Sequence, residues 1–340
     1  MVEVSIPDDL PRIAEEQLAT GELKARLAAA DQPFVARGIA RDWPLVEVGL
    51  RSAREARAYL LERARPCQFA VNIGEPAAGD RLFYDDGLEM NFRTGKSNLA
   101  NIFRGFDDNE GRVDAPMIYL SSVDMEDFFF GLLDDNSLDL GKFEPTARIW
   151  IGNRTRIAPH NDLPDNLAVC AVGRRRFILF PPEQFYNLYL GPIDNTPAGR
   201  QVSMVDLRSP DFERYPRFRE ALTHAQVADL EPGDALFIPS QWWHHVEGLE
   251  EFNILINFWW RDVARFLGQP EDALLHALLA IRDLPPRKRD WFRKLFDHYV
   301  FDPSPDAIAH LPEGKRGILD PLTAESAGRL RAFLLRSLSE

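Results

Sequence analysis

The strongest constraint on the fold is a run of short apolar segments between residues 113 and 262. They are PMIYLSS, ARIWIGN, LAVCAVG, RRFILFPP, DALFIP, WWHHVEG and FNILINFWW, and Gly, Pro and Asn separate them. Each has the length and composition of a β-strand. Many short strands in succession favour a barrel or jelly roll. We therefore expect a mainly β fold with flanking helices.

The flanks of this run have other patterns. Residues 8–30 repeat apolar positions at helical spacing, with an interruption at Gly21, while PFVARG at 33–38 is typical of a short strand. Three amphipathic helices are expected beyond residue 262. The predicted domains are an N-terminal mixed α/β segment that packs on the barrel (1–112), a barrel core (113–262) and a C-terminal helical region (263–340). The apolar content of the last favours a homodimer, and packing on the barrel is the alternative.

A long polar insert interrupts the strand pattern at residues 183–231. It is rich in Pro and is expected to form loops and a short helix near DFERYPRFREAL. Inserts of this length often line a binding face.

Charge and cysteine content narrow the class of protein. The 53 acidic residues outnumber the 40 basic ones, and the net charge of −13 argues against nucleic acid as a partner. No signal-peptide pattern and no apolar run of membrane-spanning length occur, so the cytoplasm is the expected compartment and no membrane partner is expected. Cys170, in LAVCAVG, is interpreted as a packed small side chain.

One pair of residues has metal-ligand spacing. His160 and Asp162 are two apart in a strand-like segment, so both side chains point to the same face. The pair alone is weak evidence, because about one such match is expected by chance in a chain of ordinary composition. His244 of WWHH is the best third ligand. Two His and one carboxylate leave metal positions open, which suits Fe(II) with a chelating cosubstrate and O2, whereas structural zinc takes four protein ligands.

Several motifs occur together in a specific order. They are PFVARGIARDWP, APHND, GRRRFILFPPEQF, SPDFERYPRF, PGDALFIPSQWWHHVEG and INFWW. In this order and spacing the chain resembles the JmjC and cupin-like 2-oxoglutarate oxygenases, most closely those of the factor-inhibiting-HIF type, which are asparaginyl hydroxylases. The resemblance implies a double-stranded β-helix of the jelly-roll or cupin type, with Fe(II) held by His160, Asp162 and His244. His245 is then expected to face the other side of its strand.

The resemblance also assigns the 2-oxoglutarate site. Arg175 stands where the family usually has a lysine for the distal carboxylate, and a guanidinium can hold a carboxylate through two hydrogen bonds. Tyr119 is implied to support that carboxylate, and Asn166 and Asn257 to lie near the metal-binding end. Either Ile157 or Thr155 stands near the place of a common family threonine. Alternation sends the neighbouring Arg174 and Arg176 away from the face of Arg175, towards solvent.

Substrate contacts are implied for three further residues. Trp259 resembles an aromatic residue that lines the substrate channel, and Arg200 and Gln201 fall where the family contacts its peptide. Trp242, Trp243 and Trp260 are interpreted as packing residues.

The resemblance implies hydroxylation of an amino-acid side chain in a peptide or protein, with conversion of 2-oxoglutarate to succinate and CO2. Alternatives are a small-molecule or tRNA-base hydroxylase, a cupin that uses another metal without 2-oxoglutarate, and a non-catalytic cupin-like binding protein. Histone demethylation is disfavoured because the Cys and His pattern contains no accessory zinc motif.

Overall fold

The computed structural model describes residues 9–76 and 79–339 of the chain. It divides into two compact units, Met1–Arg261 and Asp262–Glu340, which are described separately below.

Eight strands of the first unit form a jelly roll. They are β7 (Thr146–Gly152), β8 (Arg156–Asn161), β9 (Asp165–Val172), β10 (Arg175–Phe180), β11 (Gln226–Leu230), β12 (Ala235–Ile238), β13 (Trp243–Gly248) and β14 (Asn253–Trp260). One sheet contains the order β12-β9-β14-β7 and the other β11-β10-β13-β8. Apart from β10 and β11, which pair with each other in one sheet, successive strands alternate between two facing antiparallel sheets, which confirms the predicted double-stranded β-helix.

The N-terminal part of the chain extends both sheets. Strands β6 (Met117–Asp124), β3 (Phe69–Gly74) and β5 (Phe92–Ser97) continue the large sheet on one side, and β2 (Phe34–Ala36) and β1 (Ala14–Glu16) continue it on the other. Strand β4 (Arg81–Leu82) joins the edge of the small sheet through β8. The segment before residue 113 is thus built into the two sheets.

The helical prediction for residues 8–30 is wrong over much of its length. Within the described part of that range, only Leu23–Ala28 (α1) is an α-helix, and Ala14–Glu16 is a strand that pairs in parallel with β2. Two arginines hold this strand in place: Arg26 binds Glu16 at 2.8 Å and Arg37 binds Glu15 at 2.5 Å. Pairing with a distant strand has outweighed the local helical periodicity.

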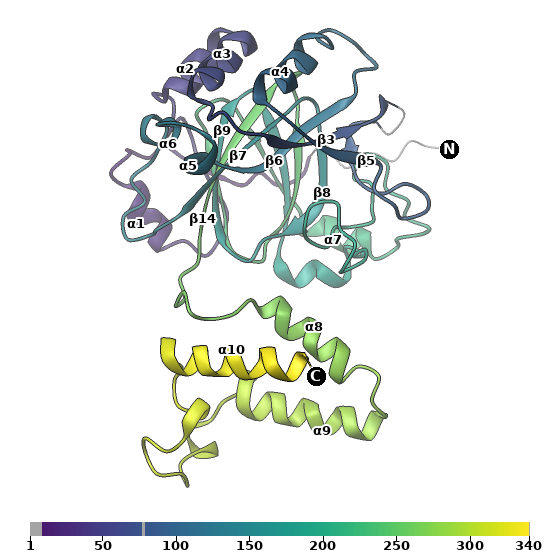
Figure 1. The fold of residues 1–340 in the computed structure, drawn as a ribbon. Coiled ribbons are helices and arrows are strands. Elements are labelled where there is room, and N and C mark those ends of the chain that lie inside the picture. The colour runs from purple at the N-terminus through teal and green to yellow at the C-terminus, as the bar shows by residue number, and fades with distance from the viewer. Residues whose placement is uncertain (1–8, 77–78, 340) are drawn as a thin grey trace. The chain divides into compact units, whose positions relative to one another are not determined.

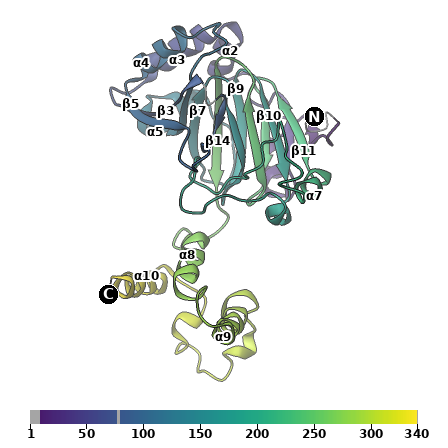
Figure 2. The ribbon, with the colours of Figure 1, turned by 90° about the vertical axis from the view of Figure 1, so that its right-hand side faces the viewer.

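Helices cover the outer face of the large sheet, as Figures 1 and 2 show. They are α2 (Pro44–Arg51), α3 (Ala53–Arg63), α4 (Leu99–Asp107), α5 (Met125–Phe128) and α6 (Leu132–Asp135). The predicted helix SAREARAYLLERA corresponds to α3, where the side chain of Ser52 caps the first turn by accepting from Glu55 N. Leu45, Leu60 and Phe103 of these helices share one apolar cluster with the sheet.

Side-chain alternation gives the large sheet two different faces. On β14, Ile254, Ile256 and Phe258 join the cluster beneath the helices, whereas Leu255 joins the second cluster, which lies between the two sheets. Asn257 shares the inner face of β14 with Leu255, because successive strand residues point to opposite sides. The inner face of β14 is therefore apolar at Leu255 and polar at Asn257.

Most of the insert folds as predicted, into loops with a short helix, α7 (Phe218–Thr223), and a 3-10 turn, Pro182–Tyr186. The prediction is wrong for its last residues, because Gln226–Leu230 form β11 and pair with β10. Its apolar residues Leu188, Val205 and Phe218 pack with Phe180 and Trp243 in a separate cluster. The insert is thus attached to the small sheet.

The three tryptophans interpreted as packing residues are buried. Trp242 lies in the cluster between the sheets, Trp243 in the insert cluster and Trp260 in the cluster beneath the helices. Cys170 is also fully buried, and burial raises the pKa of its thiol to about 12, which confirms its structural role.

The second unit contains α8 (Pro270–Ala280), α9 (Pro286–Phe296) and α10 (Ala324–Leu338). Among its described residues, only Ser326 and Ala327 are buried. Many large apolar side chains remain exposed, including Leu274, Leu275, Leu279, Trp291, Phe301, Phe333, Leu335 and Leu338. Nowhere in the described residues is a helix both long and apolar enough to cross a membrane.

A buried carboxylate fastens the N-terminal strands to the barrel. Asp234, only 5% exposed, accepts hydrogen bonds from Arg37 Nη1 at 2.5 Å, Gly38 N at 2.8 Å and Glu231 N at 2.9 Å. Replacing it with alanine leaves two backbone donors without their acceptor and removes one partner of Arg37, which keeps its contacts with Glu15 and Asp229 O. We expect Asp234→Ala to lower the free energy of unfolding by about 3 kcal/mol, measured by urea denaturation.

The control is Asp114→Ala, because Asp114 is exposed and its ion pair within the described residues is with the exposed Arg112. We expect no measurable change in its denaturation midpoint. Equal midpoints for both variants would contradict a fastening role for Asp234.

Candidate metal centre

Two neighbouring strands bring the three predicted metal ligands together. His160 of β8 lies directly opposite His244 of β13, with ring centroids 4.3 Å apart. Asp162 follows β8, and its Oδ2 lies 3.8 Å from Nε2 of His244. One donor atom from each residue falls within 4.8 Å of the others. Side-chain alternation on paired strands thus produces the cluster that was expected from the sequence.

Backbone contacts orient both imidazole rings. Nδ1 of His160 lies 2.9 Å from Ala158 O, and Nδ1 of His244 lies 3.1 Å from Trp242 O. A carbonyl can only accept, so each Nδ1 carries a proton, and in a neutral ring Nε2 then presents a lone pair. Burial, together with the nearby His160, lowers the pKa of His244 to about 4, so this ring is neutral at neutral pH, as a metal ligand must be.

The segments that carry the ligands are tied to one another. Gln241 N donates to Asp162 O at 3.0 Å, which joins the end of β8 to the turn before β13. The register of these strands shifts between His244 and Val246, so β8 has an irregularity close to Pro159. Such a bulge tolerates a proline and changes the direction of nearby side chains. Ser203 of the insert also donates from its N–H to Pro159 O at 2.8 Å.

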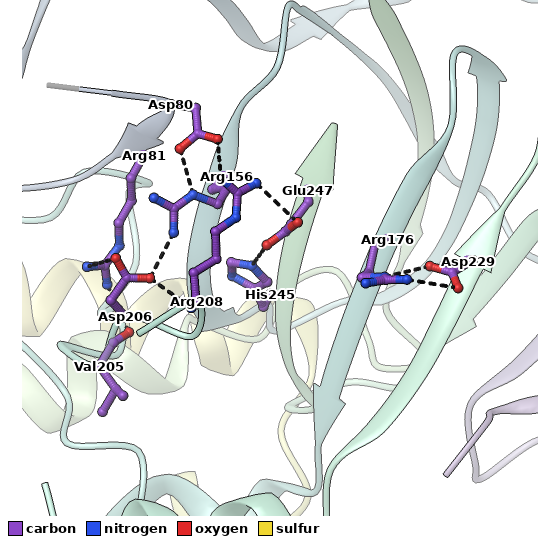
Figure 3. Close-up of polar contacts among 10 residues, drawn as sticks. All are labelled: Asp80, Arg81, Arg156, Arg176, Val205, Asp206, Arg208, Asp229, His245 and Glu247. Atoms are coloured by element: carbon purple, nitrogen blue, oxygen red, sulfur yellow. Dashed lines mark hydrogen bonds and ion pairs between the residues drawn. The ribbon is translucent and has the colours of Figure 1, made fainter. Parts of the chain in front are cut away.

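His245 points away from the cluster, as expected. Its Nε2 lies 2.9 Å from Glu247 Oε1, and Figure 3 shows the two within a network of charged side chains. The network contains Asp80, Arg81, Arg156, Asp206 and Arg208. Burial by itself would raise the pKa of Glu247, but His245 and Arg208 outweigh it and hold that pKa at about 2. This hydrogen bond gives His245 a structural role on the other side of the strand from the metal ligands.

Asp80 and Asp206 connect the network to other parts of the chain. Asp80 binds both Arg156 and Arg208 at 2.6 Å, and Asp206 of the insert binds Arg156 at 2.8 Å. The outer face of β8 and β13 is therefore fixed by the insert and by the segment before β4.

The predicted carboxylate anchor lies inside the barrel. Arg175 is 1% exposed, and within the part of the chain that the structure describes its Nε and Nη2 atoms have no hydrogen-bond partner. Burial lowers its pKa, with opposing contributions from Tyr119 and Cys170. Burial also raises the pKa of Tyr119 to about 12. By contrast, Arg174 binds Glu250 at 2.7 Å and Arg176 binds Asp229 at 2.7 Å, both on the outer surface (Figure 3 draws the second pair).

Gly152 makes room for the ring of Tyr119. A Cβ atom at this position would lie 2.7 Å from Cδ2 of Tyr119, closer than real Cβ contacts. The glycine of ARIWIG is therefore required by the position of the tyrosine, a role that the sequence analysis missed.

The two predicted asparagines meet on the inner wall. Asn257 donates from Nδ2 to Asn166 Oδ1 at 2.7 Å. The Oδ1 atom of Asn257 is buried and, among residues 9–76 and 79–339, has no donor. Ile157 belongs to the cluster between the sheets, while Thr155 precedes β8 in a turn whose carbonyl accepts from Gly248 N. The interior position near the histidine thus holds an isoleucine.

The three predicted substrate residues lie in different parts of the structure. Trp259 lies beside Trp150 on the inner wall, with ring centroids 6.0 Å apart. Gln201 instead donates to Gly191 O at 2.8 Å within the insert, and Arg200 is half-buried. The substrate roles of Arg200 and Gln201 stay predictions.

The residues present fit a divalent transition metal. Two imidazole nitrogens and one carboxylate form a facial set that leaves further coordination positions for a cosubstrate and O2. The buried guanidinium of Arg175, whose Nε and Nη2 atoms have no hydrogen-bond partner among the described residues, fits a ligand that carries a carboxylate.

A family of known proteins matches most of the chain. The model of the family described as "Cupin-like domain" matches residues 20–266. The chain belongs to the cupin-like family. The relatives described below support the wider cupin and JmjC superfamily. The narrower resemblance to asparaginyl hydroxylases stays a prediction.

Three relatives illustrate this kinship. "HSPB1-associated protein 1" of Homo sapiens is 30% identical over 203 residues, which cover 58% of this chain and 41% of that protein. "tRNA wybutosine-synthesizing protein 5" of Mus musculus is 27% identical, covering 81% of this chain and 78% of that protein. "Lysine-specific demethylase JMJ31" of Arabidopsis thaliana is 33% identical over 34% of this chain and 21% of that protein. The chain spans about half the length of the HSPB1-associated relatives that it matches.

The geometry predicts one divalent-metal site in this cupin-like chain. Purified protein, stripped of metal and titrated with Fe(II) or Mn(II) without oxygen, should bind one ion. His160→Ala and His244→Ala should each weaken binding at least about tenfold, because each removes a ligand.

His224→Ala is the matched control, because His224 is exposed and contacts Glu220 at 3.1 Å on α7. It should bind the ion as the wild-type chain does. Unchanged metal affinity in the first two variants would place the metal elsewhere.

Proposed function

We propose that the chain is an Fe(II)- and 2-oxoglutarate-dependent oxygenase that hydroxylates an amino-acid side chain in a peptide or protein. The observation that carries this proposal is Arg175. A guanidinium buried inside a barrel without a counter-charge is costly, and a carboxylate ligand removes most of that cost. A cupin that uses a metal alone has no need of a cation in this position.

In this proposal, one set of residues binds the metal and another binds the cosubstrate. His160, Asp162 and His244 hold Fe(II), while Arg175 and Tyr119 hold the distal carboxylate of 2-oxoglutarate. When bound, the metal and cosubstrate supply the oxidative chemistry, in which O2, 2-oxoglutarate and a substrate C–H bond give succinate, CO2 and a C–OH group. Tyr119 is neutral at physiological pH and can donate its O–H to the carboxylate.

The inner wall has a second task, which is to position the substrate and to exclude water. Asn166 and Asn257 fix each other near the metal-binding end, and Trp259 provides an apolar surface beside them. The insert lies along β8 next to His160 through its contact with Pro159, so it is well placed to receive a polypeptide.

A tRNA base is the second candidate substrate, favoured by the relative named for tRNA wybutosine synthesis, of which this chain covers 78%. The net charge of −13 opposes it, because binding to RNA depends on cationic surface. Succinate release stimulated by a cell extract separates the two. Loss of stimulation after protease treatment supports a polypeptide substrate, and loss after ribonuclease treatment supports tRNA.

The anchor role of Arg175 can be measured without a substrate. Wild-type protein with Fe(II) and 2-oxoglutarate, kept free of oxygen, should develop the visible charge-transfer band of the chelate. We expect Arg175→Ala to raise the Kd for 2-oxoglutarate about 100-fold, since a buried charge pair is lost. Metal affinity should be unchanged.

Arg176→Ala is the matched control, because Arg176 is the next residue on β10 and faces outward to Asp229. It should titrate as the wild-type chain does. If the wild-type chain gave no band, the 2-oxoglutarate proposal would fail, and a metal-only cupin or a binding protein would take its place.

We also propose that the second unit joins two copies of the chain. Its helices α8, α9 and α10 expose Leu279, Trp291 and Leu335, each more than half exposed. Within the described residues of this unit, the only buried apolar side chain is that of Ala327. Three amphipathic helices without a core of their own need an apolar partner surface, and a second copy offers an identical one.

The dimer proposal predicts a mass in solution of twice 38.8 kDa. The double variant Leu275→Glu, Leu279→Glu should shift the light-scattering mass to that of one chain, because buried carboxylates oppose association. Leu50→Glu, at a position 66% exposed on α2, is the control and should leave the mass unchanged. A wild-type mass of one chain would rule the dimer out.

A further inference from the structure

Five buried polar atoms on the inner wall of the barrel have, among the described residues, no hydrogen-bond partner. They are Nε and Nη2 of Arg175, Oδ1 of Asn257, and the indole Nε1 atoms of Trp150 and Trp259. Buried polar atoms in folded proteins are nearly always paired, so this concentration marks a place where a ligand completes the hydrogen bonds. Trp150 is the one residue of this group without a role so far.

Trp150 lies next to the proposed carboxylate anchor. It is on β7, two residues before Gly152, where the outward side chains Ile149 and Ile151 pack beneath the helices. Trp150 therefore faces the barrel interior. Its ring centroid lies 6.1 Å from that of Tyr119 and 6.0 Å from that of Trp259. The indole therefore stands between a residue of the proposed carboxylate site and the predicted substrate residue Trp259.

The strand opposite Trp150 is adapted to this position. The register between β6 and β7 passes from Leu120 opposite Ile151 to Val123 opposite Ile149, which leaves two residues of β6 opposite Trp150. One of them, Ser122, has a positive φ of 52°, a conformation that residues other than glycine rarely adopt. Bulges and strained residues cluster beside functional sites, where they change the direction of side chains.

The chemistry of the indole limits the ligand that it can bind. Its N–H can donate and cannot accept, so the missing partner must be an acceptor. Ile157 lies in the same cluster between the sheets, and its side chain has no hydrogen-bond donor. The neighbouring cation Arg175 makes an anionic oxygen the favoured acceptor.

We propose that Trp150 donates its Nε1–H to the distal carboxylate of 2-oxoglutarate, beside Arg175 and Tyr119. This inference rests on the proposed function, since it assigns a further binding residue to the same cosubstrate. Trp150 acts as a neutral donor that fixes the orientation of the carboxylate, while Arg175 supplies the charge.

Trp150→Phe tests this directly, because it keeps an aromatic ring and removes the donor. Calorimetry on Mn(II)-loaded protein would measure the binding of 2-oxoglutarate and of 2-oxopentanoate, which lacks the distal carboxylate. We expect about tenfold weaker binding of 2-oxoglutarate by the variant, as for loss of a hydrogen bond to a charged group, and an unchanged Kd for 2-oxopentanoate. Trp43→Phe is the control, because the indole of Trp43 already donates to Ser137 O at 3.0 Å.

The outcomes separate the two proposals. If wild-type protein fails to bind 2-oxoglutarate, the proposed function is overturned and this inference with it. If wild-type protein binds and Trp150→Phe binds equally well, or loses the same factor for both keto acids, only the role of Trp150 is overturned.

A second measurement covers a variant that does not fold. With 15N-labelled indoles, wild-type protein loaded with Zn(II) has seven indole N–H groups to observe by NMR. At least one should shift on addition of 2-oxoglutarate and not on addition of 2-oxopentanoate. The absence of any such difference would overturn the proposal.

Discussion

The antiparallel pairing of β8 with β13 is the interaction on which the site depends. It sets His160 directly opposite His244, and the backbone carbonyls of the same two strands hold the rings with Nε2 available. A shift of one residue in this register would turn one histidine outward and destroy the cluster. The rest of the first unit can be understood as support for this pairing, through helices on the outer face of the large sheet and the insert on the small one.

A second constraint is that polar groups inside a barrel need partners. Most of the buried polar groups described above satisfy it internally, as Asp234 does with three donors. On the inner wall, by contrast, atoms of Arg175, Asn257, Trp150 and Trp259 have no hydrogen-bond partner among the described residues. An apolar interior would have been more stable for the protein alone. The donor-rich character of these groups is the feature on which the proposed anionic cosubstrate rests.

Much of this arrangement could be predicted from the sequence because it follows from strand alternation and motif order. The jelly roll follows from the many short strands and the order of the motifs, and the burial of Cys170 follows from the apolar run around it. The opposite directions of His244 and His245 and the outward positions of Arg174 and Arg176 follow from a period of two. The failures came where distant contacts decide the outcome. Residues 14–16 form a strand because β2 and two arginines later in the chain bind them.

Other features had no signal that a single sequence could display. The need for Gly152 depends on the ring of Tyr119 from another strand. The unpaired state of the Trp150 indole appears only once every neighbour is placed, since tryptophan in a strand is more often a packing residue.

The charged network behind β13 has a consequence for how such proteins diversify. Arg208 and Asp206 belong to the insert, yet they clamp the outer face of the strands that carry His160 and His244. The loop expected to choose the substrate is therefore also part of the scaffold of the metal site. Replacing this whole loop with that of a relative would therefore change metal affinity as well as substrate selectivity. New specificities in this lineage are then more accessible through point changes within the loop than through its replacement.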